Sequence, residues 1–224
     1  MPKIFCFIFA RGGSKRIPKK NLKKINNKSL LEITINFAKK INKINKIFVS
    51  SDSKKILNIA KNNNVQTIRR PKSLCTSKSN EFASWKHAVK ELKKRKFVFD
   101  YFLSLPTTSP LRKKSDIMKL IHKFSHTQYD ILLCATETNR YPHYNMVVRK
   151  NNTIRPIIKK TKKIKEKNIL DLTTVGYITK PKFIMNSKGI FNGKVGYIKV
   201  PRERAIDIDD FYDLKIARFL LKDN

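Results

Sequence analysis

The chain has 224 residues, of which 40% are hydrophobic, and its formal net charge is +35. This length suits one domain with a real hydrophobic core, and the composition excludes an intrinsically disordered chain. The apolar runs are far too short to span a bilayer, and Met1-Pro2-Lys3 leads into an apolar run with no cleavage site behind it. We therefore expect a cytoplasmic protein with no membrane insertion.

The excess of basic residues suggests a nucleic-acid-binding protein, which is the main alternative from another class. Only 12 of the 51 basic residues are Arg, and the lysines are scattered over nearly every segment together with abundant Asn and Ile. That pattern indicates a coding bias, whereas recognition of bases and phosphates favours Arg gathered on one surface. We expect no specific nucleic-acid partner, although the charge favours anionic substrates.

The cysteines and histidines do not form a metal motif. The three cysteines are widely spaced, without a Cys-x-x-Cys pair, and the four histidines lack the spacing of a metal site. We predict buried, inert thiols, with neither a disulfide framework nor a zinc site.

Short apolar strands alternate with amphipathic helices along most of the chain. Strands are expected at 3–10, 46–50, 65–68, 97–105, 130–136 and 195–200. Helices are expected at 29–42, 53–63, 81–95, 115–125 and 209–222. Ser115 is the expected N-cap of the fourth helix, and Trp85 a core anchor of the third. The alternation predicts a Rossmann-like α/β fold with a mostly parallel sheet and helices on both faces.

The region from about 137 to 194 has a different character. Residues 144–149 and 153–158 predict a β-hairpin, 174–179 predict a strand, and Pro181 begins a short helix. We interpret this region as a small β-rich insertion, a lid or dimerisation arm, within a single domain of residues 1–224.

The most informative stretch is the loop that directly follows the first strand. Its sequence is Ala10-Arg11-Gly12-Gly13-Ser14-Lys15-Arg16-Ile17-Pro18-Lys19-Lys20-Asn21. Paired glycines let the backbone approach a ligand closely, and peptide N–H groups together with Arg and Lys side chains can hold phosphate oxygens. An ordinary basic surface turn is the alternative interpretation.

A pair of carboxylates near the C-terminus supplies the opposite charge. Asp207 and Asp209 are two residues apart, so in extended backbone both side chains leave the same face. Ligands of open α/β sheets bind at the carboxyl ends of the strands, where this segment and the glycine loop are both expected. The pair suits a Mg²⁺ ion that bridges the protein and a nucleoside triphosphate. Helix capping is the alternative, although Asp210 alone can meet that need.

Several segments, in order, resemble the acylneuraminate cytidylyltransferases, also called CMP-sialic acid synthetases. Ile8 to Asn21 resembles the signature loop of that family, Leu105 to Arg112 its second motif, and Ile206 to Asp209 its C-terminal metal motif. Val49 to Ser53 and Arg70-Pro71 also fall in the family's order. The resemblance therefore runs along essentially the whole chain.

This resemblance implies a nucleotide-diphospho-sugar transferase fold, with a β-rich arm that swaps across a homodimer. It implies that CTP and a 2-keto-3-deoxy sugar acid, of the nonulosonic or sialic type, give a CMP-sugar and pyrophosphate. The sugar's anomeric hydroxyl is expected to attack the α-phosphate directly, with Mg²⁺ required. The product is expected to serve surface glycan synthesis, as in lipopolysaccharide or capsule.

The resemblance also assigns roles to single residues. Arg11, Lys20 and Asp209 are the expected catalytic residues, and Asp207 and Asp209 the expected metal ligands. The expected nucleotide-binding residues are Arg11, Gly12, Gly13, Ser14, Lys15, Lys20, Asn21, Arg70 and Thr108. Physical reasoning agrees, because in phosphoryl-type transfer a protein mainly positions groups and offsets charge on the phosphates.

The sugar-binding residues are expected at Arg140, Tyr144, Asn145 and Tyr177, with Arg140 as the partner of the sugar's carboxylate. Core packing is the alternative for both tyrosines. Sialic-acid enzymes commonly have Gln where this chain has Pro106, and the segment Thr173 to Tyr177 also departs from their pattern. N-acetylneuraminate is therefore one possible substrate beside legionaminate, pseudaminate and a Kdo-type acid.

Overall fold

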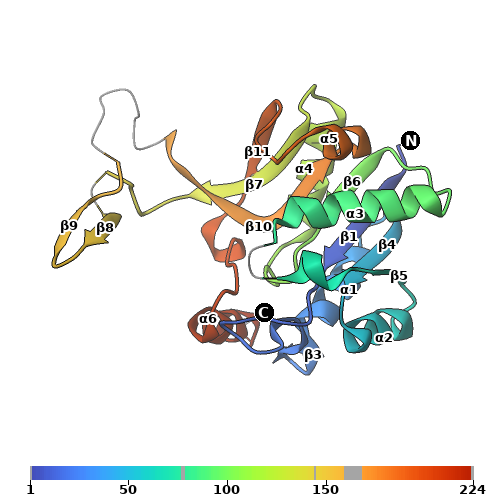
Figure 1. The fold of residues 1–224 in the computed structure, drawn as a ribbon, viewed down its shortest axis with the longest axis horizontal. Helices are drawn as coiled ribbons and strands as arrows, with labels where there is room; N and C mark the ends of the chain where they lie inside the picture. Colours follow the sequence, from blue (N-terminus) through green and yellow to red (C-terminus); the bar gives the residue numbers. More distant parts are fainter. Residues whose placement is uncertain (1, 77–78, 144, 159–167, 223–224) are drawn as a thin grey trace.

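A computed structural model describes residues 2–76, 79–143, 145–158 and 168–222 (Figure 1). A seven-stranded sheet in the order β11-β7-β10-β6-β1-β4-β5 forms its centre. The mutually parallel strands are β1 (Ile4–Phe9), β4 (Ile44–Ser51), β5 (Gln66–Arg69), β6 (Tyr101–Ser104), β7 (Ile131–Glu137) and β11 (Val195–Lys199). Strand β10 (Leu170–Thr179) runs antiparallel to both of its neighbours. The predicted mostly parallel α/β sheet is confirmed.

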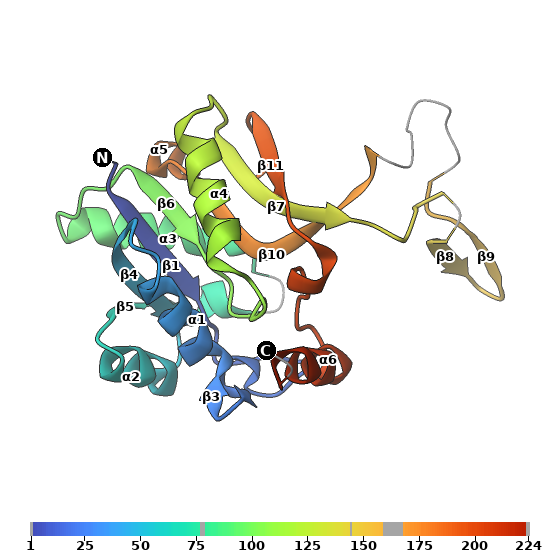
Figure 2. The same ribbon diagram turned by 180° about the vertical axis from the view of Figure 1, so that it is seen from behind.

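Helices cover both faces of this sheet, as predicted. One face carries α1 (Leu30–Lys39), α2 (Lys54–Asn62) and α4 (Lys114–Ser125), and the other carries α3 (Glu81–Lys94) and α5 (Pro181–Asn186). Figure 1 views the sheet from the α3 side, and Figure 2 views it from the α1 and α4 side.

Strand β1 shows why the sheet is buried on both faces. Cys6 and Ile8 pack with the α1 side, whereas Phe5 and Phe7 pack with the α3 side. The alternation follows from the two-residue period of a strand, and it explains why β1 is apolar throughout. The rings of Phe7 and Phe102 stack with centroids 4.2 Å apart.

A third, smaller core joins the loop after β1 to the C-terminal helix. Ile17 and Ile25 from the loop side pack with Ile208 and with Leu214 of α6 (Phe211–Lys222). The remaining elements of this side are the short pair β2 (Lys24–Ile25) and β3 (Lys28–Ser29) and the 3₁₀ turn η1 (Lys20–Leu22). Two further 3₁₀ turns are η2 (Lys72–Cys75) and η4 (Arg202–Arg204). This core therefore brings the glycine loop and the aspartate segment together.

Several element boundaries differ from the prediction, and contacts in the structure explain two of these differences. Lys113 is the N-cap of α4 instead of Ser115, because the carboxylate of Asp116 accepts the backbone N–H of Lys113 at 2.9 Å. Strand β6 is shorter than 97–105, because its ladder with β1 begins at Tyr101, opposite the first residue of β1.

The β-rich region predicted at about 137–194 has two parts in the structure. The hairpin of β8 (Val147–Lys150) and β9 (Thr153–Pro156) stands apart from the body of the molecule (Figure 1). Residues 170–179 instead form a central strand between β6 and β7, so they belong to the main sheet and not to an insertion. Within the described residues, no helix has the length and apolarity needed to cross a membrane.

Candidate active site

A cavity of about 310 Å³ lies at the carboxyl ends of β1 and β6, where ligands of open α/β sheets bind. Of the predicted nucleotide-binding residues, Arg11, Lys20, Asn21, Arg70 and Thr108 line this cavity. Its further lining residues are Phe9, Leu74, Thr76, Ser79, Glu81, Ser84, Pro106, Thr107 and Thr174.

Backbone and side-chain hydrogen bonds fix the glycine loop in this cavity. The N–H of Gly12 donates to Oδ1 of Asp52 at 2.8 Å, and Nδ2 of Asn21 donates to the carbonyl oxygen of Arg11 at 2.8 Å. Nη1 of Arg11 donates to the carbonyl oxygen of Thr76 at 2.9 Å. The loop is therefore held in shape at its first half, while Gly13 and Lys15 are exposed.

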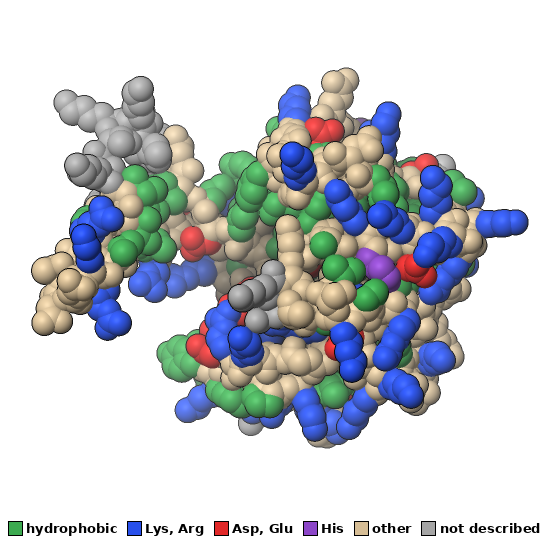
Figure 3. Space-filling model, viewed as in Figure 1, with side chains coloured by type: hydrophobic (Ala, Val, Ile, Leu, Met, Phe, Trp, Pro, Cys, Tyr) green, Lys and Arg blue, Asp and Glu red, His purple; other side chains and the backbone are tan. Residues whose placement is uncertain are grey.

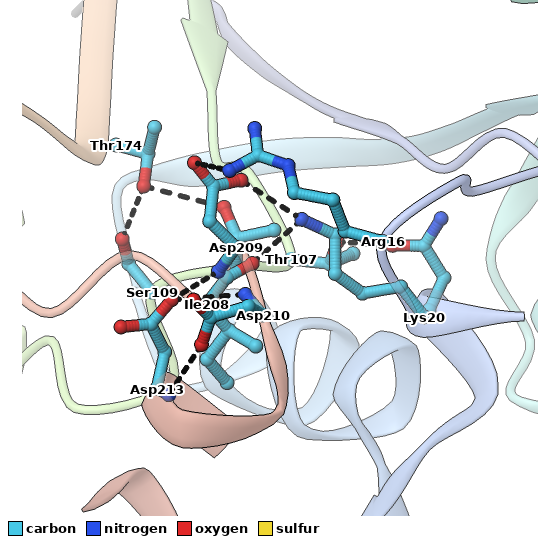
Figure 4. Close-up of polar contacts among 11 residues, drawn as sticks. Arg16, Lys20, Thr107, Ser109, Thr174, Ile208, Asp209, Asp210 and Asp213 are labelled. Carbon is cyan, nitrogen blue, oxygen red and sulfur yellow. Dashed lines mark hydrogen bonds and ion pairs between the residues drawn. The ribbon is translucent and has the colours of Figure 1, made fainter. Parts of the chain in front are cut away.

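The cations of the loop meet the aspartate segment directly (Figure 4). Nζ of Lys20 donates to the carbonyl oxygen of Ile208 at 2.6 Å and to Oδ1 of Asp209 at 3.2 Å. Nη1 of Arg16 lies 3.1 Å from Oδ2 of Asp209. The backbone N–H of Ile208 donates to the carbonyl oxygen of Thr108 at 2.9 Å, so the second and third motifs are joined as well.

Asp210 is the residue that caps helix α6, which was the alternative role considered for the aspartate pair. Its Oδ1 accepts the backbone N–H groups of Tyr212 at 2.8 Å and Asp213 at 3.0 Å, which caps the first turn of α6. The capping role therefore falls to Asp210 and does not account for the side chains of Asp207 and Asp209.

The environment of Asp207 fits a divalent cation. Its Oδ1 is buried without a hydrogen-bond partner among the described residues. Desolvation raises the pKa of Asp207, and the charge of Asp209 adds to this effect, while the hydroxyls of Thr108 and Thr174 oppose it. No group of three or more His, Cys, Asp or Glu that could hold a metal ion occurs in the described ranges. Two carboxylates suffice for Mg²⁺, which keeps several waters and takes its other ligands from substrate phosphates.

Two buried arginines shape the cavity wall in different ways. Nη1 of Arg70 donates to Oγ of Ser84 at 3.0 Å, and its guanidinium lies over the ring of Phe9, 5.8 Å from the centroid. Arg112 donates to the carbonyl oxygens of Pro106 and Thr174, and so it ties the second motif to β10. Burial lowers the pKa of Arg112 to about 10.

A second cavity of about 320 Å³ lies beside the first one, on the side of α3. Its walls include Trp85, Tyr177, Ile190 and Phe191. The rings of Trp85 and Tyr177 meet edge to face, with centroids 5.6 Å apart. Glu81 lines both cavities and therefore marks their junction. Tyr177, which was predicted to bind the sugar, thus contacts a cavity that adjoins the first cavity.

The other predicted sugar residues lie elsewhere. Arg140 and Asn145 sit at the base of the β8–β9 hairpin and are exposed. The side chain of Asn145 bonds locally, accepting the N–H of Tyr141 and donating to the carbonyl oxygen of Asn139 at 3.1 Å. Neither residue lines either of the two cavities. Tyr144 is outside the described residues.

Three residues near the site were missed by sequence reasoning: Arg16, Asp52 and Glu81. Arg16 stood within the glycine loop, and Asp52 directly follows strand β4, which is the position where an α/β sheet places site residues. The sequence did place Asp52 within the family-ordered segment Val49 to Ser53, but without a role of its own. Glu81 begins a helix, where an acidic residue is ordinary, so its position carried no signal.

The fold and the cavity together define a class: an α/β enzyme whose cationic glycine loop and paired carboxylates suit a nucleoside triphosphate. The cytidylyltransferase family matches residues 5–170. The chain belongs to this family and is a cytidylyltransferase. Membership in an enzyme family argues against the nucleic-acid-binding alternative.

Individual relatives span almost the whole chain. The post-translational flagellin modification protein B of Campylobacter coli is 29% identical over 230 residues, covering 100% of this chain and 97% of that protein. A pseudaminic acid cytidylyltransferase of Campylobacter jejuni is 28% identical, covering 99% and 97%. The solved structure of a CMP:2-keto-3-deoxy-manno-octonic acid synthetase complexed with CTP superimposes with a TM-score of 0.74 at 14% identity, covering 99% of each chain. The likeness to that structure is one of fold.

Proposed function

We propose that this cytidylyltransferase transfers CMP from CTP to a nonulosonic-type 2-keto-3-deoxy sugar acid and releases pyrophosphate. One observation carries the proposal: Lys20 of the glycine loop lines the first cavity, and its Nζ lies only 3.2 Å from Oδ1 of Asp209, so the cationic loop and the aspartate segment meet beside that cavity. The relatives named for pseudaminic acid and flagellin modification support the choice of substrate class.

In this proposal the triphosphate of CTP lies against the loop of residues 11–21. Arg11 and Lys20 offset the negative charge that develops on the phosphates in the transition state. Asp207 and Asp209 would hold Mg²⁺, which would supply positive charge to the phosphates. Lys20 and Arg16 pair with Asp209 in the structure, so both cations already lie beside the carboxylate that would hold the ion.

The sugar acid occupies the second cavity, against Tyr177. Its anomeric hydroxyl oxygen forms a bond to the α-phosphorus while the bond from that phosphorus to the pyrophosphate oxygen breaks. The hydroxyl proton passes to the carboxylate of Asp209 and on to solvent. The products are the CMP-sugar and pyrophosphate, and the protein's main contribution is to hold both reactants in line.

The β8–β9 hairpin is proposed as the dimerisation arm. Val147, Val148, Ile154, Ile157 and Ile158 expose between 43% and 69% of their surface. Figure 3 shows hydrophobic side chains gathered over this hairpin, away from the body. Such a patch is costly to leave in water and favours a partner surface. The sugar-binding role proposed for Arg140 and Asn145 depends on this dimer, since neither residue lines a cavity of its own subunit described above.

The test is an assay of pyrophosphate release with CTP and Mg²⁺ over a panel of acids: N-acetylneuraminate, legionaminate, pseudaminate and Kdo. We expect turnover with at least one acid, and a loss of about 100-fold or more in kcat for Asp209→Asn, because metal binding and proton removal both need its carboxylate. Asp100→Asn, at the opposite end of the sheet, is the matched control and should keep full activity. Full activity of Asp209→Asn, or turnover with none of these acids, contradicts the proposal.

A further inference from the structure

We propose that Glu81 is a specificity-determining residue, whose carboxylate accepts a hydrogen bond from a hydroxyl or acylamino group of the sugar acid. The inference rests on the proposed function, since it assumes that the second cavity receives the sugar. Glu81 is the first residue of α3 and lines both cavities, so a substrate that spans the two must pass it.

Neighbouring residues position the Glu81 carboxylate but engage only one of its two oxygens. Nε1 of Trp85 donates to Oε1 of Glu81 at 3.3 Å. The cap of α3 is formed by Asn80, whose Oδ1 accepts the N–H of Phe82 at 2.9 Å, so Glu81 has no capping role. Within the described residues, no hydrogen bond or ion pair engages Oε2 of Glu81. One oxygen is therefore positioned, and the other is left for a ligand.

The second cavity is otherwise lined mainly by aromatic and apolar side chains. Trp85, Tyr177 and Phe191 offer ring faces and edges to a sugar's C–H groups, whereas Glu81 is the ionisable acid of its lining. Such a cavity binds through few polar groups, and those groups decide which substituents are accepted. An ionised carboxylate accepts hydrogen bonds and donates none. Glu81 therefore selects a substituent that carries an O–H or N–H group.

The same charge orients the substrate. Glu81 repels the carboxylate of the sugar acid, which must therefore point away from α3. Solvent reaches the Glu81 side chain through the two cavities, yet the surrounding protein desolvates it enough to raise its pKa, and Asp207 adds to this effect. An acceptor in such a setting discriminates strongly, because an analogue without a donor leaves it unpaired.

The experiment takes the best acid from the panel and compares KM for that acid, KM for CTP and kcat in wild type, Glu81→Gln and Glu81→Leu. We expect Glu81→Leu to raise KM for the acid by about 10-fold to 100-fold, in line with hydrogen bonds to charged groups. Glu81→Gln should raise it less, because the amide oxygen still accepts. KM for CTP should change by less than about threefold, since the nucleotide contacts are kept.

Glu91→Gln is the matched control on the same helix, since Glu91 pairs with Lys94 at the surface and should leave all three constants unchanged. CTP binding measured by calorimetry confirms that each variant is folded, and Glu81→Gln carries the test alone should Glu81→Leu fail to fold.

If wild type turns over an acid and neither variant raises KM for it, the inference fails and the proposed function stands. An equal loss of CTP affinity also overturns it, because Glu81 then serves the nucleotide. Turnover of no acid by wild type overturns the proposed function itself.

Discussion

Gly12 and Gly13 are neighbours under different constraints. A Cβ on Gly12 would lie 2.9 Å from Cβ of Ser53, and the N–H of Gly12 is bonded to Asp52. A Cβ on Gly13 meets nothing within 4 Å. The first glycine is required by the protein itself, whereas the second matters only if a ligand approaches it.

We therefore expect Gly12→Ala to weaken CTP binding by about tenfold or more, because the loop must move away from Ser53 and lose its bond to Asp52. Calorimetric titration with CTP measures the effect. Gly13→Ala is the comparison: a loss as large as that of Gly12→Ala would show that phosphates contact both positions, and equal wild-type affinity of Gly12→Ala would refute the steric argument.

Single residues could be assigned from the sequence where the residue types in a motif indicate a particular chemistry. Arg11, Lys20 and Asp209 could be grouped in advance because cations and carboxylates suit one triphosphate. In the structure Arg11 and Lys20 line the first cavity, and Asp209 pairs with Lys20. Asp52 could not be assigned a partner, because its bond is to a backbone N–H 40 residues earlier in the chain. Only the parallel pairing of β1 with β4 brings those positions together.

The N-terminus of α6 links helix stability to the site. Asp210 caps the helix, and Asp213 accepts the N–H groups of Asp209 at 2.8 Å and Asp210 at 2.9 Å (Figure 4). The segment that bears the proposed metal ligands is therefore fixed by the first turn of α6, which packs through Leu214 on the third core.

Asp210→Ala should destabilise the protein by about 1 kcal/mol, the usual cost of a lost N-cap, and lower the melting temperature by about 2–4 °C. Thermal unfolding followed by circular dichroism gives this value. Asp171→Ala, on an exposed position of β10, is the control and should shift the melting temperature far less. Equal shifts in the two variants would show that the cap contributes nothing.

The sequence predicted whether a segment is a helix or a strand much better than it predicted which strands pair. The strand at 174–179 was expected from its apolar and β-branched residues, yet it is longer, at 170–179, and lies at the centre of the sheet. The alternation of residues within a segment shows that the segment is a strand. The order of strands in a sheet depends instead on contacts between segments far apart in the sequence, which that alternation does not reveal. The same limit explains why the 137–194 region was taken as one insertion.

For the whole molecule, the exposed hairpin leads to a prediction about assembly. We expect a homodimer in solution, and Ile154→Glu should shift it toward monomer, because a charge replaces an apolar contact in the arm. Multi-angle light scattering coupled to size-exclusion chromatography measures the mass. Val98→Glu, at a position 76% exposed outside the arm, should leave the mass unchanged. A monomeric wild type, or a fully dimeric Ile154→Glu, contradicts the arm's role.

The chain contains a single tryptophan, and the fold places it in the wall of the second cavity. The indole N–H of Trp85 donates to Glu81, and its ring packs edge to face against Tyr177. A molecule that enters the second cavity therefore changes the environment of the fluorophore. The intrinsic tryptophan fluorescence of the unlabelled protein therefore reports ligand binding in the second cavity, independently of turnover. Ligand preference can be ranked by titration before any product is made.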